Sequence, residues 1–345
     1  MKPDPKIPVI FCLDGEPDPR KTTPGNPIPW VGFERAVPFF EDLRSRLTAL
    51  SGRPARYSWF FRLDPQIKDT YGTAQWPLEQ YAAAIEEFLA AGDEIGVHPH
   101  AFKWNEADKA WTGHYGDQEW VDYCVRMCFE AYEDFFGKTC RLIRFGDRWL
   151  NNESLRFAEK MGAQYDLTPE PGYPRQPASL MMKIVGEKFT DDLPDFRTVP
   201  HEPYRPSAAD FSVADPVKTD GLWIIPLTTG MISPKGGRLE RLYARMFRPA
   251  HLRPWNATLN LNQRPDHFRI MLYQWLETAR YLAPVMRSDI FTVRAHAENL
   301  KANLETLLSH PKAADFVFTT PQEAMCALGY KNRRKVPRGG ERAYA

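Results

Sequence analysis

Residues 7–18 read IPVIFCLDGEPD, an apolar run that ends in three acids. The apolar part predicts a buried strand over Val9–Leu13. Asp14, Glu16 and Asp18 follow at alternate positions, where side chains of an extended chain point to the same side. This first strand therefore carries carboxylates at its exit and indicates an α/β protein with functional groups at its strand ends.

A second cluster has the same form. Residues 93–100 read DEIGVHPH, with a predicted strand over Ile95–His98 and a second imidazole at His100. One segment can thus offer carboxylates, and the other two imidazoles, to a single ion. His and carboxylate ligands suit zinc and similar first-row metals. The two clusters together predict a divalent-metal site, most simply a zinc site.

The rest of the chain alternates between extended and helical patterns. Further strands are predicted at Arg56–Phe61, Leu142–Phe145, Gln164–Leu167, Leu222–Leu227, Phe291–Ala295 and Phe316–Thr319. Helices are predicted at Pro77–Ala91, Glu119–Phe136, Asp266–Leu282 and Ala297–Leu308. This alternation predicts a parallel sheet, either a barrel or an open doubly wound sheet, whose chemistry gathers at the carboxyl ends of the strands. Arg144 and His296 lie at such ends as well.

Each of these groups also has a plainer interpretation. Gly15 and Pro17 are turn formers, so the acids alone would also suit a turn. The two histidines could be loop residues that bond to the backbone. Arg144 could form an ordinary surface ion pair with a carboxylate, and His296 could simply begin a helix. The shared position at strand ends favours the functional interpretation.

Residues 169–220 are rich in proline and lack a long periodic element, which predicts an irregular insertion over the open face of the fold. Trp149 and Trp223 lie near predicted loops, and aromatic faces of this kind stack on sugar rings. Residues 331–345 form a basic tail, which we expect to be a solvated terminus.

The composition excludes several classes of protein. Among the 345 residues, Lys+Arg number 45 and Asp+Glu 44, so a net charge of +1 gives no reason to expect nucleic acid as a partner. Five cysteines without a repeated spacing do not suggest a disulfide framework. No signal peptide or membrane span is predicted, which favours a cytoplasmic protein. The oligomeric state is not predicted by the sequence.

Over most of residues 7–327 the chain resembles the polysaccharide deacetylase family, the NodB-homology group of carbohydrate esterases. Five segments resemble the family's motifs in order: FCLDGE at 11–16, DEIGVHPH at 93–100, IRFGD at 143–147, DGLWIIPL at 220–227, and His296 together with FTTPQEA at 318–324. Two spacings depart from the family pattern. Gly15 separates two acids that are usually adjacent, and Phe102 stands where the second metal histidine is usual, so that His100 takes that part. The chain therefore resembles a divergent member.

The resemblance implies a distorted (β/α) barrel in one domain over residues 1–330. It implies a metal-dependent hydrolase that removes an N-acetyl group from an amino sugar of a polysaccharide or its precursor. Asp14 would be the general base, Arg144 would orient it, and His296 would be the catalytic acid. The metal ligands would be Glu16, His98 and His100. The substrate would be bound by Asp18, Asp147, Trp149 and Trp223.

Two other functions remain open at this stage. One is a metal-dependent amidohydrolase that acts on an amide of a small metabolite. The other is a non-catalytic relative that binds carbohydrate through Trp149 and Trp223.

Overall fold

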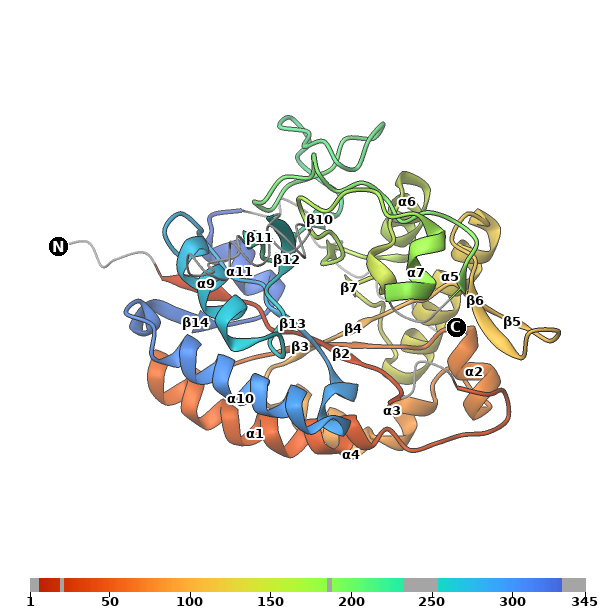
Figure 1. The fold of residues 1–345 in the computed structure, drawn as a ribbon, viewed down its shortest axis with the longest axis horizontal. Helices are drawn as coiled ribbons and strands as arrows, with labels where there is room; N and C mark the ends of the chain where they lie inside the picture. Colours follow the sequence, from red (N-terminus) through yellow and green to blue (C-terminus); the bar gives the residue numbers. More distant parts are fainter. Residues whose placement is uncertain (1–5, 19–21, 185–187, 233–253, 331–345) are drawn as a thin grey trace, which may run out of the picture.

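The computed structural model describes residues 6–18, 22–184, 188–232 and 254–330 (Figure 1). The predicted basic tail, 331–345, lies outside these residues. Within them, no helix combines the length and the apolar character that crossing a membrane requires.

A seven-stranded sheet forms the centre of the fold. Its strand order is β10-β8-β7-β4-β3-β2-β13, and every neighbouring pair is parallel. The strands are β2 (Cys12–Gly15), β3 (Ser58–Phe61), β4 (Glu94–Val97), β7 (Leu142–Ile143), β8 (Tyr165–Asp166), β10 (Trp223–Ile224) and β13 (Val285–Arg287). Because all of them run in one direction, their carboxyl ends meet at one edge of the fold.

Three smaller sheets accompany the central one. They pair β1 with β14, β11 with β12, and β6 with both β5 and β9. Their strands are β1 (Ile7–Val9), β14 (Phe316–Phe318), β11 (Thr229–Ile232), β12 (Trp255–Thr258), β5 (Phe102–Asn105), β6 (Ala110–Gly113) and β9 (Lys188–Phe189).

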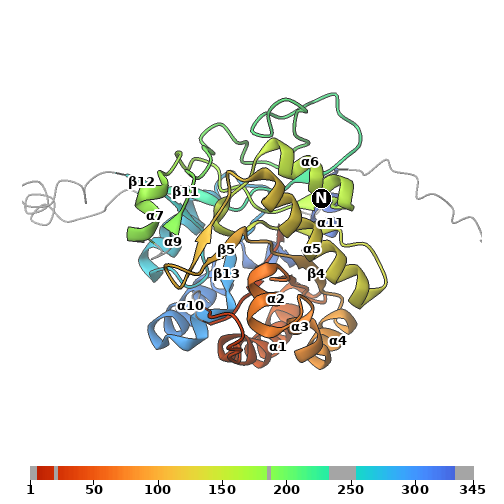
Figure 2. The ribbon, with the colours of Figure 1, turned by 90° about the vertical axis from the view of Figure 1, so that its right-hand side faces the viewer.

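Helices surround the sheet (Figures 1 and 2). They are α1 (Val31–Ser51), α2 (Pro65–Tyr71), α3 (Trp76–Gln80), α4 (Ala82–Ala90), α5 (Gln118–Phe136), α6 (Asn152–Met161), α7 (Ala178–Ile184), α9 (Pro265–Trp275), α10 (Arg294–Leu308) and α11 (Pro321–Ala327). Short 3₁₀ turns are η1 (Gly146–Arg148), η3 (Ser288–Thr292) and η4 (Ala313–Asp315). In Figure 1, α1 and α10 run side by side, and an ion pair between Arg46 and Glu305 joins them.

Successive side chains along each strand point to opposite faces of the sheet and belong to two separate buried apolar clusters. Side chains on one face of the strands, such as Leu13 and Phe61, belong to the large cluster shared with the helices. Phe33 of α1 packs edge-on against Phe61, with ring centroids 5.3 Å apart. Side chains on the other face, such as Cys12 and Phe60, belong to a smaller cluster. This period of two puts Asp14, two residues after Cys12, on the face of the smaller cluster.

Backbone hydrogen bonds bring the two edges of the sheet toward each other. Beyond β10, the amide of Thr228 donates to the carbonyl of Ala283, which closely precedes β13, at 3.1 Å. The amide of Leu261 likewise donates to the carbonyl of Val285 at 2.9 Å. The predicted distorted (β/α) barrel is therefore confirmed, with irregular backbone rather than a regular ladder between its first and last strands.

The structure corrects one predicted strand and divides another. Residues 291–295, predicted as a strand, lie in η3 and the start of α10, and the strand beside β2 is β13 instead. The first predicted strand is divided into β1 and β2, which pair with different neighbours. Within 169–220, the described residues include the short helix α7 and strand β9.

Candidate metal centre and active site

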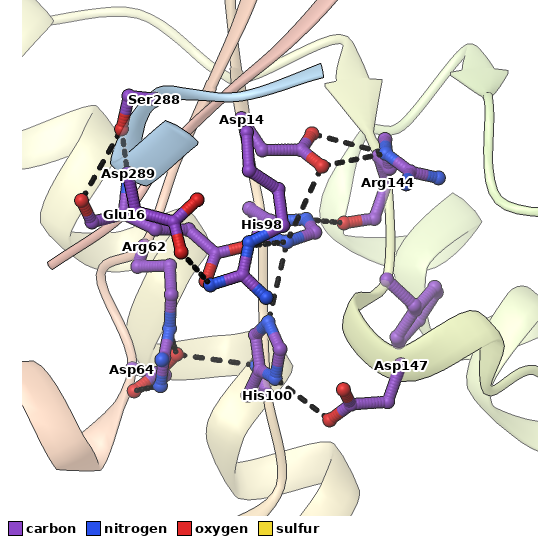
Figure 3. Close-up of polar contacts among 12 residues, drawn as sticks. Asp14, Glu16, Arg62, Asp64, His98, His100, Arg144, Asp147, Ser288 and Asp289 are labelled. Carbon is purple, nitrogen blue, oxygen red and sulfur yellow. Dashed lines mark hydrogen bonds and ion pairs between the residues drawn. The ribbon is translucent and has the colours of Figure 1, made fainter. Parts of the chain in front are cut away.

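The carboxyl ends of the strands surround a cavity of about 630 Å³. Its lining includes a group that we call the strand-end cluster: Asp14, Glu16, His98, His100, Arg144 and Asp147. All six were predicted as site residues, and they come from segments up to 133 residues apart in sequence. Figure 3 shows the carboxylates of Asp14 and Glu16 and the two imidazoles gathered at one point.

Three of these side chains have the spacing of a metal site. One ligand atom from each of Glu16, His98 and His100 lies within 4.8 Å of the others, and all three residues are buried. His98 Nε2 lies 3.3 Å from Glu16 Oε1 and 3.2 Å from His100 Nε2. Ligands about 2.0 Å from a tetrahedral zinc ion would stand roughly 3.3 Å apart. The donor set therefore fits zinc or a similar ion.

The outer nitrogen of each imidazole is held by an acceptor. His98 Nδ1 lies 2.6 Å from the carbonyl oxygen of Arg144, and His100 Nδ1 lies 2.9 Å from Asp147 Oδ2. The Tyr115 hydroxyl donates to the same Asp147 oxygen at 2.6 Å. A hydrogen on each Nδ1 leaves the lone pair of each Nε2 directed at the common point, which is the arrangement that metal-ligating histidines require.

The surroundings of two of the ligands, Glu16 and His100, favour the protonation states that bind a metal. Burial, helped by the nearby Arg62 cation, lowers the pKa of His100 to about 4, although the Asp147 carboxylate acts in the opposite direction. For Glu16, burial raises the pKa, but Arg287 and His98 together hold it well below its ordinary value. A neutral imidazole beside an ionised carboxylate suits a divalent cation.

The backbone at η1 is fitted closely around His100. A Cβ added to Gly146 would lie 2.1 Å from His100 Nε2, so only glycine leaves this space for the ring. The next two residues, Asp147 and Arg148, have positive φ angles of 54° and 59°. Residues other than glycine seldom adopt this backbone conformation. It tends to occur where function constrains the backbone. The turn directs the Asp147 carboxylate at His100.

Asp14 lies beside the triad and is held by Arg144. The guanidinium Nε donates to Asp14 Oδ1 at 3.0 Å and to Oδ2 at 3.3 Å. Arg144 Nη1 also donates to the carbonyl oxygen of Leu167 at 3.2 Å, which fixes the guanidinium. Asp14 Oδ2 lies 3.9 Å from His98 Nε2. A carboxylate so placed is next to the metal position without being one of the three clustered ligands.

Two arginines that the sequence analysis did not single out support the centre. Arg287 ends β13 and is the register partner of Asp14, and its Nη2 lies 3.0 Å from Glu16 Oε2. Arg62 is buried and forms two hydrogen bonds with Asp64, which in turn accepts from the His100 amide at 3.2 Å. The pattern Asp64-Pro65 does predict a helix start, but nothing local in the sequence predicts that its carboxylate also reaches His100.

Further lining residues come from later in the chain. We call them the C-terminal cluster: Glu170, Tyr173, Gln176, Trp255, Asn256 and Thr258. Glu170 is 7% exposed, whereas Trp255 is 39% exposed. None of them was predicted, because no strand pattern or paired spacing distinguishes them.

The structure does not bring His296 to the cavity. Its side chain is exposed on α10 and is not among the lining residues. The prediction rested on a strand at 291–295, and that strand is wrong. The real strand end beside Asp14 is Arg287, nine residues earlier.

Three predicted substrate-binding residues also lie away from the cavity lining. Asp18 Oδ1 accepts from the Gly32 amide at 2.8 Å and holds the start of α1. Trp149 is buried and stacks on Tyr115, with ring centroids 5.2 Å apart. Trp223 lies under the Arg205 guanidinium, 4.4 Å from the ring centroid. Their contacts are those of residues that support the fold.

Comparisons with known proteins place the fold. No family model matches the chain, and no curated protein matches it in sequence. A solved structure from Parabacteroides distasonis, assigned as a glycoside hydrolase/deacetylase, aligns with a TM-score of 0.54 at 12% identity, covering 94% of this chain and 71% of its own.

Two structures assigned as polysaccharide deacetylases align less closely. The one from Pseudomonas aeruginosa has a TM-score of 0.48 at 10% identity and covers 96% of this chain and 94% of its own. The one from Mycobacterium smegmatis has a TM-score of 0.47 at 13% identity and covers 99% and 97%. The Parabacteroides structure therefore carries the comparison, and it shows that this chain shares the fold of a protein assigned as a glycoside hydrolase/deacetylase.

Proposed function

We propose that the protein is a metal-dependent hydrolase that removes an N-acyl group, most simply N-acetyl, from an amino sugar of a polysaccharide or its precursor. One observation carries the proposal: the Asp14–Arg144 pair lies directly beside the Glu16–His98–His100 triad in one cavity. The shared fold with a glycoside hydrolase/deacetylase supports it.

The ion would be held by Glu16 Oε1 and by the Nε2 atoms of His98 and His100. Zinc bound by three protein ligands keeps a further position open, lowers the pKa of a bound water and polarises a carbonyl oxygen. Asp147 and the Arg144 carbonyl would keep the two rings oriented toward the ion.

Asp14 would act as the general base. Its carboxylate is buried, fixed by Arg144 and 3.9 Å from a ligand nitrogen, so it would stand within reach of a water at the centre. A positioned base of this kind contributes about 10²–10⁴ in rate. Arg144 would keep the carboxylate oriented while the proton is transferred.

A carbohydrate substrate is favoured by the C-terminal cluster. The exposed Trp255 offers an aromatic face, and the amide nitrogen of Gln176 and the amide oxygen of Asn256 offer a donor and an acceptor, while the other end of each amide is bonded to Arg148 or Gly172. The cavity of about 630 Å³ is within the usual range of about 300–1,000 Å³ for ligand sites. These features suit a sugar with an N-acyl substituent better than a small, wholly apolar ligand.

The test combines metal content with product analysis. Wild type, a His98→Ala/His100→Ala double variant and a His296→Ala control are dialysed and measured by elemental analysis, then incubated with N-acetylglucosamine oligomers. We expect about one equivalent of zinc or a similar metal, with release of acetate, in wild type and the control. The double variant should lack both.

Two results would contradict the proposal. A wild type that retains no specific metal after supplementation would remove the hydrolase mechanism. A metal-loaded wild type that opens or cleaves small amides but releases no acetate from N-acetylated sugars would instead favour the metabolite amidohydrolase.

A further inference from the structure

The cavity contains a carboxyl group that the proposed mechanism leaves without a role. Glu170 follows β8, so it stands at the same end of the fold as Asp14. It is 7% exposed, although it lies in a proline-rich segment that the sequence analysis treated as an irregular insertion. A buried acid that lines a cavity needs partners or a function, because desolvation of a carboxylate is costly.

The contacts of Glu170 hold one of its oxygens and leave the other available. The Thr258 hydroxyl donates to Oε2, and Arg148 Nη1 lies 3.8 Å from the same oxygen. Arg148 is itself fixed by a 2.7 Å hydrogen bond to Gln176 and by the Tyr173 ring, 4.3 Å from its guanidinium carbon. Among the residues that the structure describes, Oε1 has no hydrogen-bond partner.

The Arg144 guanidinium interacts electrostatically with Glu170 and with Asp14, the proposed general base. Burial lowers the pKa of the Arg144 guanidinium, but the Asp14 and Glu170 carboxylates raise it above its ordinary value, in that order of effect. The charge of one buried guanidinium therefore interacts with both carboxyl groups, which line the same cavity. Two carboxyl groups in different surroundings at one site are a common basis for separate base and acid roles.

Hydrolysis of an amide also needs a proton donor, because an amine leaves poorly as an anion. His296, predicted for this role, is exposed outside the cavity lining. Arg148 and Arg287 stay charged and cannot give up a proton. Of the other acids that line the described cavity, Glu16 belongs to the triad, Asp147 is bonded to His100 and Tyr115, and Asp14 would receive the proton of water.

We propose that Glu170 is the catalytic acid that protonates the departing amine, an inference that rests on the proposed function. A water O–H bond breaks, its proton passes to Asp14, and the oxygen bonds to the acyl carbon. The C–N bond then breaks as the carboxyl proton of Glu170 passes to nitrogen. The products are a carboxylic acid, which ionises to the carboxylate by releasing its proton to solvent, and an amine. Solvent then returns a proton to Glu170 while Asp14 releases one.

The test compares two substrates that differ in their leaving group. An N-acetylated amino sugar and 4-nitrophenyl acetate deliver the same acetyl group, but 4-nitrophenolate departs without protonation. Replacement Glu170→Gln should lower kcat for the amide by about 10²–10⁴ and leave turnover of the ester close to wild type. Asp14→Asn should lower kcat for both the amide and the ester, and His296→Ala should lower kcat for neither. Metal content, measured in every variant, should equal that of wild type.

Two outcomes would overturn the inference alone. One is a Glu170→Gln variant that cleaves the amide as fast as wild type does. The other is an equal loss on amide and ester with metal retained, which would make Glu170 a positioning residue. A metal-loaded wild type that cleaves the ester but no N-acyl sugar would overturn the proposed function, and this inference with it.

Discussion

The two clusters that line the cavity differ in how their side chains are held. In the strand-end cluster, Asp14, His98 and His100 follow or end strands of the sheet and are fixed by hydrogen bonds to other buried groups. In the C-terminal cluster, Glu170 keeps an oxygen without a partner among the described residues, and Trp255 is 39% exposed. The first cluster is preorganised for an ion, whereas the second offers groups to a larger ligand.

This difference separates two requirements of a hydrolase. A metal centre needs ligands within a few tenths of an ångström of their final positions, which the rigid ends of parallel strands provide. Substrate recognition can use side chains from loops and hairpins, where one scaffold accepts many sequences. We therefore expect substitutions in the strand-end cluster to affect chemistry and metal. Substitutions in the C-terminal cluster should affect substrate binding, except at Glu170, the proposed catalytic acid.

The largest effect is expected at Asp14. Asp14→Asn keeps the size of the side chain and removes the base, so kcat should fall by about 10²–10⁴. Metal content should stay at the wild-type value, because Asp14 is not one of the three clustered ligands. Steady-state kinetics with elemental analysis tests this, and near wild-type turnover would exclude Asp14 as the base.

A second prediction concerns acid sensitivity of the metal-free protein. The pKa of His100 is about 4 in the folded state against an ordinary value of 6.5, with burial as the main cause of the difference. Between these values the unfolded chain binds more protons, so stability should fall as pH is lowered from 6.5 to 4. The loss should be about 3 kcal/mol. Urea unfolding across this range should show it.

The matched comparison for this pH effect is His100→Gln. That variant carries no imidazole at position 100, so its unfolding free energy should decline less steeply over the same range. An identical slope in wild type and variant would show that other groups cause the acid sensitivity.

A pair of glycine substitutions contrasts the two regions directly. Gly146→Ala places a methyl group against the His100 ring, so metal affinity should fall by about 10–100-fold. Gly230→Ala, in β11, meets only Met271 Cε at 3.9 Å and should leave metal affinity unchanged. Competition with a chelator measures both. Equal affinities would mean that η1 adjusts to the extra methyl group.

The smallest effect is expected at Trp255. Loss of the aromatic face in Trp255→Ala should raise KM for an N-acetylated oligosaccharide by about 3–10-fold, the equivalent of about 0.5–1.5 kcal/mol. The kcat value should change little, since Trp255 is not one of the three clustered ligands and its ring lies at an exposed position of the cavity lining. A variant with lowered kcat and unchanged KM would place Trp255 in the chemistry instead.

Local pattern predicted the strand-end cluster well. Each of its members ends or follows an apolar run, and in a parallel sheet such positions share one edge regardless of their distance in sequence. The same reasoning failed at His296, because 291–295 has strand-like composition but lies in a 3₁₀ turn and a helix start. It also overestimated Trp149 and Trp223, since composition does not distinguish an aromatic ring that binds sugar from one that packs in the fold.

The sequence by itself determined the α/β class with a parallel sheet, most of the strands along the chain, and which acids and imidazoles could share an ion. Periodicity and residue type specify these features locally. Only the tertiary structure decided that Arg287 rather than His296 stands beside Asp14, that Asp64 supports His100, and that Glu170 faces the cavity. These contacts join segments whose proximity depends on sheet register and on the path of irregular backbone, and neither leaves a periodic signal in the sequence.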